Sequence, residues 1–390
     1  MIYLDNSATT KVDARVRDAM LPYLGDEYGN ASSIYDLGRH ARIALEEARA
    51  TVARTIGSDD SEIIFTSSGT EANNHAIKGT IFHAHAQGRR FEEMSVITSA
   101  AEHHAVLEPC EFLSSLGIAT TKLRVNDCAQ VSADDVLANV FSGTALISIM
   151  SVNNEIGTIN PVSEIARRAK VTVSNTLIHC DGVQALGKIP IDVKDWGIDM
   201  LSLSAHKVHG PKGIGALFIR RGMMIEPLLH GGAQERNRRG STENVALAVG
   251  FAKAVELMQS EWNDRMAHLS TLKHYLLHAL KAMPEIILNT PDEDSVSSIV
   301  NFTFRSDLLP KVDGEALIIR FDLAGIAVST GSACTSGSLQ PSHVLLAMGK
   351  GDEVAAKSIR VSLSKDTSAD DLNAFLMVLK KLLAELSASH

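Results

Sequence analysis

The middle of the chain, between about residues 60 and 220, alternates short apolar runs with longer stretches of helical pattern. Short apolar runs bounded by small or polar residues are typical of buried strands, and apolar residues every three or four positions indicate helices. Strands are predicted at Ile63–Thr66, Ser95–Thr98, Ala145–Met150, Leu177–Cys180, Met200–Ser204 and Ala216–Ile219. Helices are predicted between them, at Thr70–Ala86, His104–Leu116 and Val162–Val173. This alternation predicts right-handed crossovers and a mainly parallel sheet.

The pattern changes after about residue 240. A helical stretch from Glu243 to Ala282 is longer than one uninterrupted helix usually is. Strand-like pieces follow at Ser298–Phe304 and Ile359–Ser362, and a closing helix at Ala369–Leu386. We therefore expect an α/β protein with two domains. Residues 15–257 would form a large domain around the parallel sheet, and residues 1–14 with 258–390 a smaller α+β domain.

Composition places the chain among ordinary globular proteins. Of its 390 residues, 45% are hydrophobic and 21% charged, as is usual for soluble domains. No apolar run approaches the roughly 18 residues that a membrane span needs. The first residues, MIYLDNSATT, lack the basic and apolar regions of a secretory signal, and the net charge of −9 disfavours nucleic acid as a main partner. A cytoplasmic protein without membrane or nucleic-acid partners is expected.

Four cysteines, Cys110, Cys128, Cys180 and Cys334, are widely separated and form no CxxC pair. This spacing does not match the common zinc and disulfide frameworks, so we expect no metal site and a reducing compartment. In such a compartment a lone thiol is either a small buried hydrophobe or a reactive group.

The first strand end with unusual residues is the segment Thr66 to Glu71, which runs directly into a helix. Small hydroxyl residues and Gly69 at a helix N-terminus offer free backbone N–H groups and the positive end of the helix dipole. Such an end is suited to binding phosphate. The alternative is a plain helix cap formed by Ser68 or Thr70.

The second strand end carries Asp181, at the end of an apolar strand. A buried carboxylate is costly unless a positive group meets it. A protonated pyridine nitrogen would be such a partner, because a carboxylate keeps that ring positively charged as an electron sink. A helix cap at Asp181 is the alternative interpretation.

The third strand end carries Lys207, within Ser204-Ala205-His206-Lys207. A lysine directly after a buried strand is poorly explained as a solvated charge, whereas desolvation would lower its pKa and favour a Schiff base. Lys212 lies on the same loop, but its Gly-Pro-Lys-Gly context indicates an exposed turn. A phosphate site, a ring-nitrogen carboxylate and a Schiff-base lysine along one sheet together suit pyridoxal phosphate.

Longer motifs make the likeness specific. The sequence resembles class V aminotransferase-fold enzymes, and among them the cysteine desulfurases of the NifS/IscS type. The likeness runs nearly end to end and implies an aspartate aminotransferase-like, pyridoxal-phosphate-dependent transferase fold. The matching segments are Tyr3–Thr10, Gly29–Ser33, Ala101–His104, Val152–Gly157, Ser204–Lys207, Arg239–Thr242, Gly331–Ser336 and Ser358–Arg360.

The resemblance assigns roles by position. His103 would stack on the cofactor ring and help move protons, Asn154 and Gln184 would bind near the ring oxygen, and Asp181 would bind the ring nitrogen. The phosphate would be held by four residues of one chain: Gly69, Thr70, Ser204 and His206. Thr242 would reach the phosphate from the partner subunit, which implies a homodimer. Arg360, with Asn154 nearby, would bind the substrate carboxylate, a task that suits a planar guanidinium.

Cys334 lies among glycines and small polar residues, which permit several backbone conformations, so we expect it on a mobile loop. The resemblance implies that Lys207 removes the Cα proton of L-cysteine and that the Cys334 thiolate attacks the substrate sulfur. Alanine and a Cys334 persulfide would result, and an acceptor protein, such as an iron–sulfur scaffold, would take the sulfur. The other three cysteines are interpreted as structural.

Two residues depart from the family pattern near the expected substrate entrance. Ala31 stands where proline is usual and Tyr35 where histidine is common. Two other functions stay open: a selenocysteine lyase of the same fold, and a non-catalytic binding partner that retains the fold.

Overall fold

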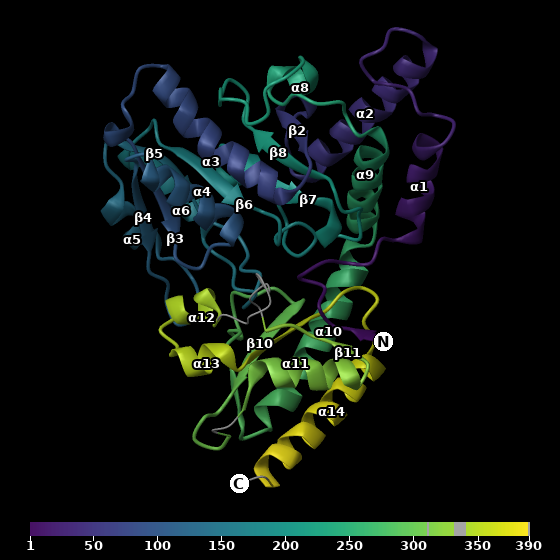
Figure 1. Cartoon of the computed structure of the whole chain (residues 1–390), viewed down its shortest axis with the longest axis vertical. Helices are drawn as coiled ribbons and strands as arrows, with labels where there is room; N and C mark the ends of the chain where they lie inside the picture. Colours follow the sequence, from purple (N-terminus) through teal and green to yellow (C-terminus); the bar gives the residue numbers. More distant parts are fainter. Residues whose placement is uncertain (310–311, 331–340, 389–390) are drawn as a thin grey trace.

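The structure, a computed structural model, describes residues 1–309, 312–330 and 341–388. A larger body contains a seven-stranded sheet with helices on both faces, and a smaller body around a three-stranded sheet lies at one end of it (Figure 1). The strands are β1 (Ile2–Tyr3), β2 (Ile63–Thr66), β3 (Ser95–Ser99), β4 (Ala119–Leu123), β5 (Thr144–Ser148), β6 (Leu177–Asp181), β7 (Met200–Ser204), β8 (Gly215–Ile219), β9 (Ile286–Leu288), β10 (Ile299–Phe304), β11 (Ile326–Ala327) and β12 (Ser358–Ser362).

The large sheet has the strand order β2-β8-β7-β6-β5-β3-β4. Strands β3 to β7 run parallel to one another, and β8 is antiparallel to both β7 and β2. The prediction of an α/β protein with a mainly parallel sheet is therefore confirmed. The six predicted strands are all present, within two residues at each end. Strand β4 was missed because it is a half-exposed edge strand, whose polar residues give no apolar run.

The helices connect these strands and cover both faces of the large sheet. They are α1 (Ala14–Leu24), α2 (Asp36–Thr55), α3 (Gly69–Ala86), α4 (His104–Ser115), α5 (Ala133–Asn139), α6 (Val162–Thr172), α7 (Val193–Trp196), α8 (Gln234–Asn237), α9 (Val245–Ser260), α10 (Trp262–Lys281), α11 (Gly314–Leu323), α12 (His343–Ala347), α13 (Asp352–Ala356) and α14 (Ala369–Ala388). Short 3₁₀ turns lie at Asp60–Glu62, Phe91–Glu93 and Ala205–Lys207.

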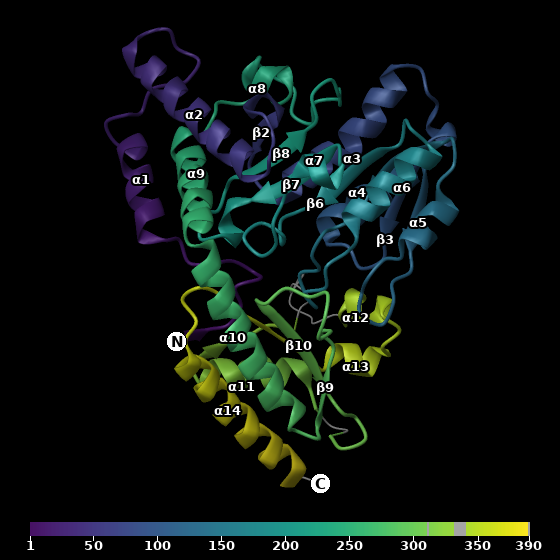
Figure 2. The ribbon, with the colours of Figure 1, turned by 180° about the vertical axis from the view of Figure 1, so that it is seen from behind.

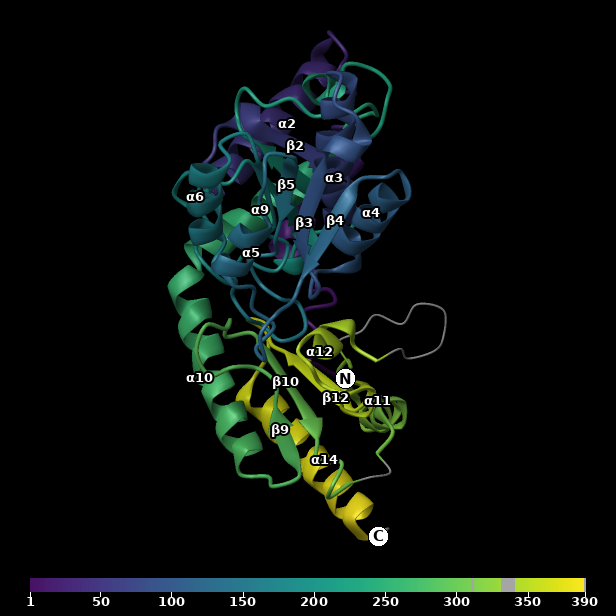
Figure 3. The same ribbon diagram turned by 90° about the vertical axis from the view of Figure 1, so that its left-hand side faces the viewer.

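Two apolar layers enclose the large sheet. Helices α3 and α4 pack on one face, around buried side chains such as Ile77 and Val106. Helices α2, α6 and α9 contribute buried side chains to the opposite face, among them Leu45, Ile165 and Phe251. Figure 3 shows α3 and α4 on one side of the strands and α6 and α9 on the other. Because both faces are covered, functional loops are left at the strand ends.

The smaller body has a core of its own, built by β10, β12, α10, α11 and α14. Strand β10 lies between β9 and β12 and is antiparallel to both. The N-terminus joins this body, since β1 pairs with β11 and Leu4 is buried in the same core. The domain division after residue 257 stays a prediction.

The predicted helical stretch from Glu243 to Ala282 is two helices, α9 and α10, which meet at Glu261. Helix α10 extends from the larger body alongside the smaller one (Figure 2). No elements were predicted before residue 60, where α1 and α2 lie against α9. Across the described residues, no helix combines the length and apolarity needed to cross a bilayer.

The segment around α8 holds four non-glycine residues at positive φ: Glu235 at 46°, Arg236 at 57°, Asn237 at 62° and Ser241 at 118°. The Glu235 carboxylate anchors this segment by accepting hydrogen bonds from the Arg49 guanidinium at 2.6 and 3.0 Å and from the Phe65 N–H at 3.0 Å. Each such backbone conformation costs about 1–3 kcal/mol for a residue with a Cβ atom. This buried ion pair therefore holds a strained loop in place.

Replacing Ser241 by glycine is expected to stabilise the folded chain by about 1 kcal/mol, because relief of strain at φ 118° exceeds the extra entropy of glycine in the unfolded chain. Chemical denaturation measures the change. The control is Ser32→Gly, an exposed serine outside the left-handed region, which should be neutral or destabilising. An unchanged or lower stability for Ser241→Gly would contradict the strain.

Candidate active site

A cavity of about 710 Å³ lies at the carboxyl ends of β6 and β7, where the two bodies face each other. It is lined by residues from the N-terminal segment, the start of α3, the loops after β3, β5, β6 and β7, helix α11 and strand β12. The structure thereby brings together the following predicted site residues: Gly69, Thr70, His103, Asn154, Asp181, Gln184, Ser204, His206, Lys207 and Arg360. This position agrees with the rule that ligands bind at the carboxyl ends of parallel strands.

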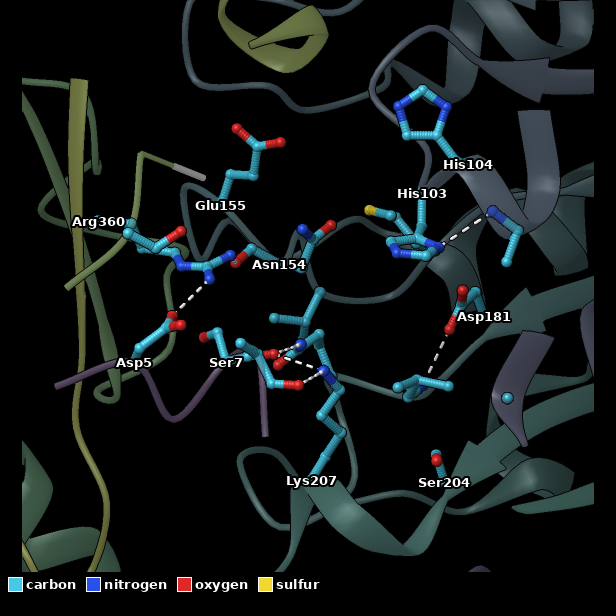
Figure 4. Close-up of a pocket in the computed structure, with 18 of the residues that line it drawn as sticks. Asp5, Ser7, His103, His104, Asn154, Glu155, Asp181, Ser204, Lys207 and Arg360 are labelled. Atoms are coloured by element: carbon cyan, nitrogen blue, oxygen red, sulfur yellow. Dashed lines mark hydrogen bonds and ion pairs between the residues drawn. The ribbon is translucent and has the colours of Figure 1, made fainter. Parts of the chain in front are cut away.

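Lys207 ends the 3₁₀ turn that follows β7 and extends into the cavity (Figure 4). Its Nζ donates to the backbone oxygens of Ser7 at 2.5 Å and Ala8 at 2.7 Å. Burial, with a further contribution from the positive charge of Arg360, lowers the pKa of Lys207 to about 8. Much more of its amine is therefore neutral near pH 7 than for an exposed lysine, as a nucleophile or base requires.

Asp181 is the last residue of β6 and is only 6% exposed. Its Oδ2 accepts from Asn73 Nδ2 at 2.7 Å and its Oδ1 from the Val183 N–H at 3.0 Å. Within the described part of the chain, no ion pair reaches this carboxylate. Since it lines the cavity and keeps unused lone pairs, it offers a cationic ligand atom a buried counterion.

Helix α3 begins at the cavity with a cap that leaves two donors unused. Of the two cap residues considered from the sequence, Ser68 and Thr70, Ser68 is the N-cap. Its Oγ accepts from the Glu71 N–H at 3.1 Å. Nothing in the described residues hydrogen-bonds to the N–H groups of Gly69 and Thr70. A Cβ on Gly69 would lie 2.6 Å from Val183 Cγ2, so any larger residue here would force Val183 to move.

Ser204 and His206 lie beside this helix start and also line the cavity. The Ser204 Oγ is buried without a hydrogen-bond partner in the described structure. Burial and the neighbouring charge of Lys207 lower the pKa of His206 to about 4, so its ring is neutral near pH 7. With its Nδ1 at 3.1 Å from Thr9 Oγ1, the ring can direct Nε2 to a ligand. These donors, with the N–H groups of Gly69 and Thr70, are of the kind that suits an anion.

His103 is the N-cap of α4, and its Nδ1 accepts from the Ala105 N–H at 3.0 Å. His103 is exposed toward the cavity, yet partial desolvation by the surrounding protein lowers its pKa, so the neutral ring is favoured. Because Nδ1 uses its lone pair in the cap, the proton of the neutral ring sits on Nε2. The helix cap therefore fixes the tautomer of His103.

Arg360 extends from β12 and is 4% exposed. Its Nη2 lies 2.7 Å from Asp5 Oδ1, and its Nη1 donates to the Asn154 carbonyl oxygen at 3.1 Å. Its buried Nε has no hydrogen-bond partner in the described structure. Figure 4 shows Arg360 and Asp5 paired on one side of Lys207, and Asp181 on the other. A carboxylate ligand would thus meet a guanidinium that keeps an unused donor at Nε.

Several residues of the cavity had no predicted role. Asp5 and Ser7 belong to a motif that was recognised, but their contacts with Arg360 and Lys207 join positions far apart in the sequence.

Glu155 is buried and accepts at 2.5 Å from the Oγ of Ser342, which is the N-cap of α12. His343 is half-buried there, with Nε2 at 2.8 Å from the Glu102 carbonyl oxygen. Asn73 has a sequence signal, because it lies one helical turn after Gly69.

The remaining predicted residues lie elsewhere. Thr242 is on the exposed loop after α8 and does not line the cavity of its own chain, so its role across a dimer stays a prediction. Ala31 and Tyr35 do not line the cavity within one copy of the chain either. Cys334 lies outside the described residues.

The three described cysteines differ from a reactive thiol. Burial raises the pKa of Cys110 to about 12 and raises that of Cys180 further. Burial also raises the pKa of the half-buried Cys128. All three are free in the described structure, and none lines the cavity. None of them carries the thiolate that sulfur chemistry requires.

The aminotransferase class-V family model matches residues 2–375. The chain belongs to this family of pyridoxal-phosphate-dependent enzymes. It is 46% identical over 386 residues to cysteine desulfurase IscS of Dictyoglomus turgidum, covering 99% of this chain and 95% of that protein. It is 44% identical to cysteine desulfurase IscS of Methanosarcina thermophila, covering 99% and 92%. Within the class V family the chain therefore belongs to the cysteine desulfurases.

Solved structures agree with this placement. A NifS-like protein superposes with a TM-score of 0.90 at 36% identity, covering 98% of this chain and 99% of that one. A structure described as SspA in complex with cysteine gives a TM-score of 0.81 at 35% identity, covering 93% and 99%. The resemblance seen in the sequence motifs is confirmed, and so is the predicted fold.

Proposed function

We propose that the chain converts L-cysteine to L-alanine with pyridoxal phosphate as cofactor and passes the sulfur to an acceptor as a persulfide on Cys334. The observation that carries this proposal is Lys207, a half-buried amine with a lowered pKa that extends into a cavity also lined by phosphate-suited donors and a buried carboxylate. Membership of the cysteine desulfurases and the cysteine complex of the SspA structure support the choice of substrate.

The residues of the cavity fit the proposed cofactor. The unpartnered Ser204 Oγ, the N–H groups of Gly69 and Thr70, and neutral His206 are donors suited to a phosphate. Asp181, a buried carboxylate without an ion pair in the described residues, suits the protonated ring nitrogen. His103 would face the ring, Gln184 and Asn154 the ring oxygen, and Lys207 would hold the cofactor covalently. When bound, pyridoxal phosphate supplies the electron sink that stabilises negative charge at the substrate Cα.

The chain's own groups would then position the substrate and move its protons. Arg360 would bind the carboxylate of L-cysteine, which places the Cα proton near the amine of Lys207. Lys207 would take this proton, for which a pKa near 8 is well matched at neutral pH. His103, protonated on Nε2, would donate or relay a proton on the opposite side of the cavity.

Sulfur transfer would be a thiol reaction of Cys334. Its thiolate would attack the substrate Sγ, forming the S–S bond of the persulfide while the Cβ–Sγ bond breaks. The electron pair of the broken bond passes to the carbon skeleton, which takes up protons and leaves as L-alanine. The raised pKa values of Cys110, Cys128 and Cys180 support the assignment of this step to Cys334.

The proposal extends to partners. Thr242 lies on an exposed loop, where it could contribute to the phosphate site of a second copy, so we propose a homodimer with shared sites. The sulfur acceptor would be a protein, with an iron–sulfur scaffold as the expected type. The compartment would be the cytoplasm.

The proposed function is tested with the purified chain. Protein loaded with pyridoxal phosphate should absorb near the border of visible and ultraviolet light, and incubation with L-cysteine should release L-alanine. The persulfide is expected as a mass increase of one sulfur atom on the peptide that contains Cys334. Loaded protein that leaves cysteine unchanged, or that releases alanine without this modification, would refute the proposal.

Replacing Arg360 by lysine is expected to raise KM for L-cysteine by about 10- to 100-fold, because a point charge replaces a planar fork that binds carboxylates with two hydrogen bonds. The change in kcat should be smaller, since the proton-transfer groups remain. Steady-state kinetics measure both constants. The control is Arg220→Lys, an exposed arginine outside the cavity. An unchanged KM in Arg360→Lys would exclude the carboxylate role.

A further inference from the structure

A second amine, that of Lys188, lies just behind the cavity. Lys188 comes four residues after Gln184 in the turns that follow β6, and its Nζ donates to Gln184 Oε1. The opposite end of the same amide, Gln184 Nε2, donates to the Ser7 carbonyl oxygen at 3.0 Å. That oxygen also accepts from Lys207 Nζ at 2.5 Å. One chain of hydrogen bonds therefore joins Lys188, Gln184, Ser7 and Lys207.

These contacts allow the Gln184 amide only one orientation. The Ser7 carbonyl oxygen can only accept, so it requires the NH₂ end of the amide. The Lys188 amine donates to the oxygen end of the amide, and it can do so whether it is charged or neutral. A rotated amide would place its oxygen against the Ser7 oxygen, which loses that hydrogen bond and leaves buried acceptors unpaired. Gln184 is only 5% exposed, so water does not readily replace these partners.

The environment of Lys188 is costly for a charge. Burial, together with the nearby charges of Lys207 and Arg360, lowers the pKa of Lys188 well below its usual range. Its amine still donates hydrogen bonds when neutral. In the described residues Lys188 forms no ion pair, and its hydrogen bond to Gln184 accounts for a lysine here. The catalytic steps proposed above do not use it.

We propose that Lys188 is a positioning residue that fixes the Gln184 amide with its NH₂ end toward Ser7 and the cavity. The role rests on the proposed function, since Gln184 would use this NH₂ end to meet the ring oxygen of the cofactor. Lys188 acts through Gln184 and contacts neither substrate nor cofactor. Through the shared Ser7 oxygen, the same contact helps to set where the Lys207 amine rests.

The test is a double-mutant cycle on loaded protein with Lys188→Met, Gln184→Ala and the double variant. Lys188→Met should weaken cofactor binding about three- to tenfold, the equivalent of roughly one hydrogen bond. It should also move the pH midpoint of the visible absorption band. Both effects should be absent when Lys188→Met is added to Gln184→Ala, because the amide is then already lost. Equilibrium dialysis and a spectroscopic pH titration measure them.

Lys273→Met is the matched control. Lys273 is a buried lysine with a pKa lowered to about 8, and its Nζ donates to Ser295 Oγ at 2.7 Å and to the Val296 carbonyl oxygen at 3.0 Å. It does not line the cavity, so its replacement should lower thermal stability without moving the absorption band. If Lys188→Met does not fold, Lys188→Gln, which keeps a polar side chain one bond shorter, enters the same cycle.

The outcomes separate the two proposals. Wild-type protein that never acquires the band would refute the proposed function, and the role of Lys188 with it. A wild-type band with Lys188→Met indistinguishable from wild type would refute the positioning role alone. Equal effects of Lys188→Met with and without Gln184 would also overturn it, since Lys188 would then act by another route.

Discussion

Replacement of Lys207 by alanine is expected to reduce alanine formation from L-cysteine by about 10³-fold or more. The substitution removes both the amine that would hold the cofactor covalently and the base that would take the Cα proton. The half-buried Lys207 amine, with a pKa of about 8, donates to the backbone oxygens of Ser7 and Ala8. Among the described residues, no other lysine lines the cavity. A second, direct readout is reduction with borohydride, which should leave cofactor attached to wild type and none attached to Lys207→Ala.

Lys212→Ala is the control for this variant. Lys212 lies five residues further along the same loop and is exposed, outside the cavity. It should keep its activity and its covalent cofactor. Cofactor still attached to Lys207→Ala after reduction would show that another amine holds it, and the site would have to be reassigned.

Replacement of Cys334 by alanine is expected to abolish persulfide formation and sulfur transfer, while cofactor binding and its absorption band remain. The reason is chemical: a thiolate is the attacking group, and the other three cysteines have raised pKa values. Mass spectrometry of the Cys334 peptide and an assay of alanine release measure the loss. Alanine release should fall by about 10³-fold, since none of the described cysteines lines the cavity, where it could take the sulfur.

Cys128→Ala is the matched control, because Cys128 is the half-buried cysteine among those described. It should transfer sulfur like wild type. Selenocysteine provides a further arm: a strict selenocysteine lyase would retain alanine release in Cys334→Ala with that substrate. Sulfur transfer that survives in Cys334→Ala would contradict the assignment.

Residue patterns predicted several of the residues that the structure gathers around the cavity at one end of the sheet. Lys207, Asp181 and Gly69 were recognised because each follows a short apolar strand, and such ends meet on one edge of a parallel sheet. The same reasoning missed β4, since an edge strand with a solvent-exposed face has no continuous run of apolar residues. It also did not decide whether Ser68 or Thr70 is the N-cap of α3, because the choice depends on backbone angles that residue type alone does not set.

Contacts between distant segments were not predictable from local pattern. Asp5 pairs with Arg360, and Ser7 accepts from both Gln184 and Lys207, only because β1 joins the smaller body and carries the N-terminal segment to the cavity. The tautomer of His103 likewise follows from its position as the cap of α4. The strain at Ser241 depends on a turn whose shape is held by the Arg49–Glu235 ion pair.

The sequence alone determined the α/β class, six of the seven strands of the large sheet and the chemical groups at the strand ends, because these depend on residues close together in the chain. Its motifs also determined the family. The tertiary structure decided which partners those groups meet, how far burial lowers the pKa of Lys207, and which way the Gln184 amide faces. Desolvation and hydrogen-bond geometry arise from segments hundreds of residues apart, and only the folded chain brings these together.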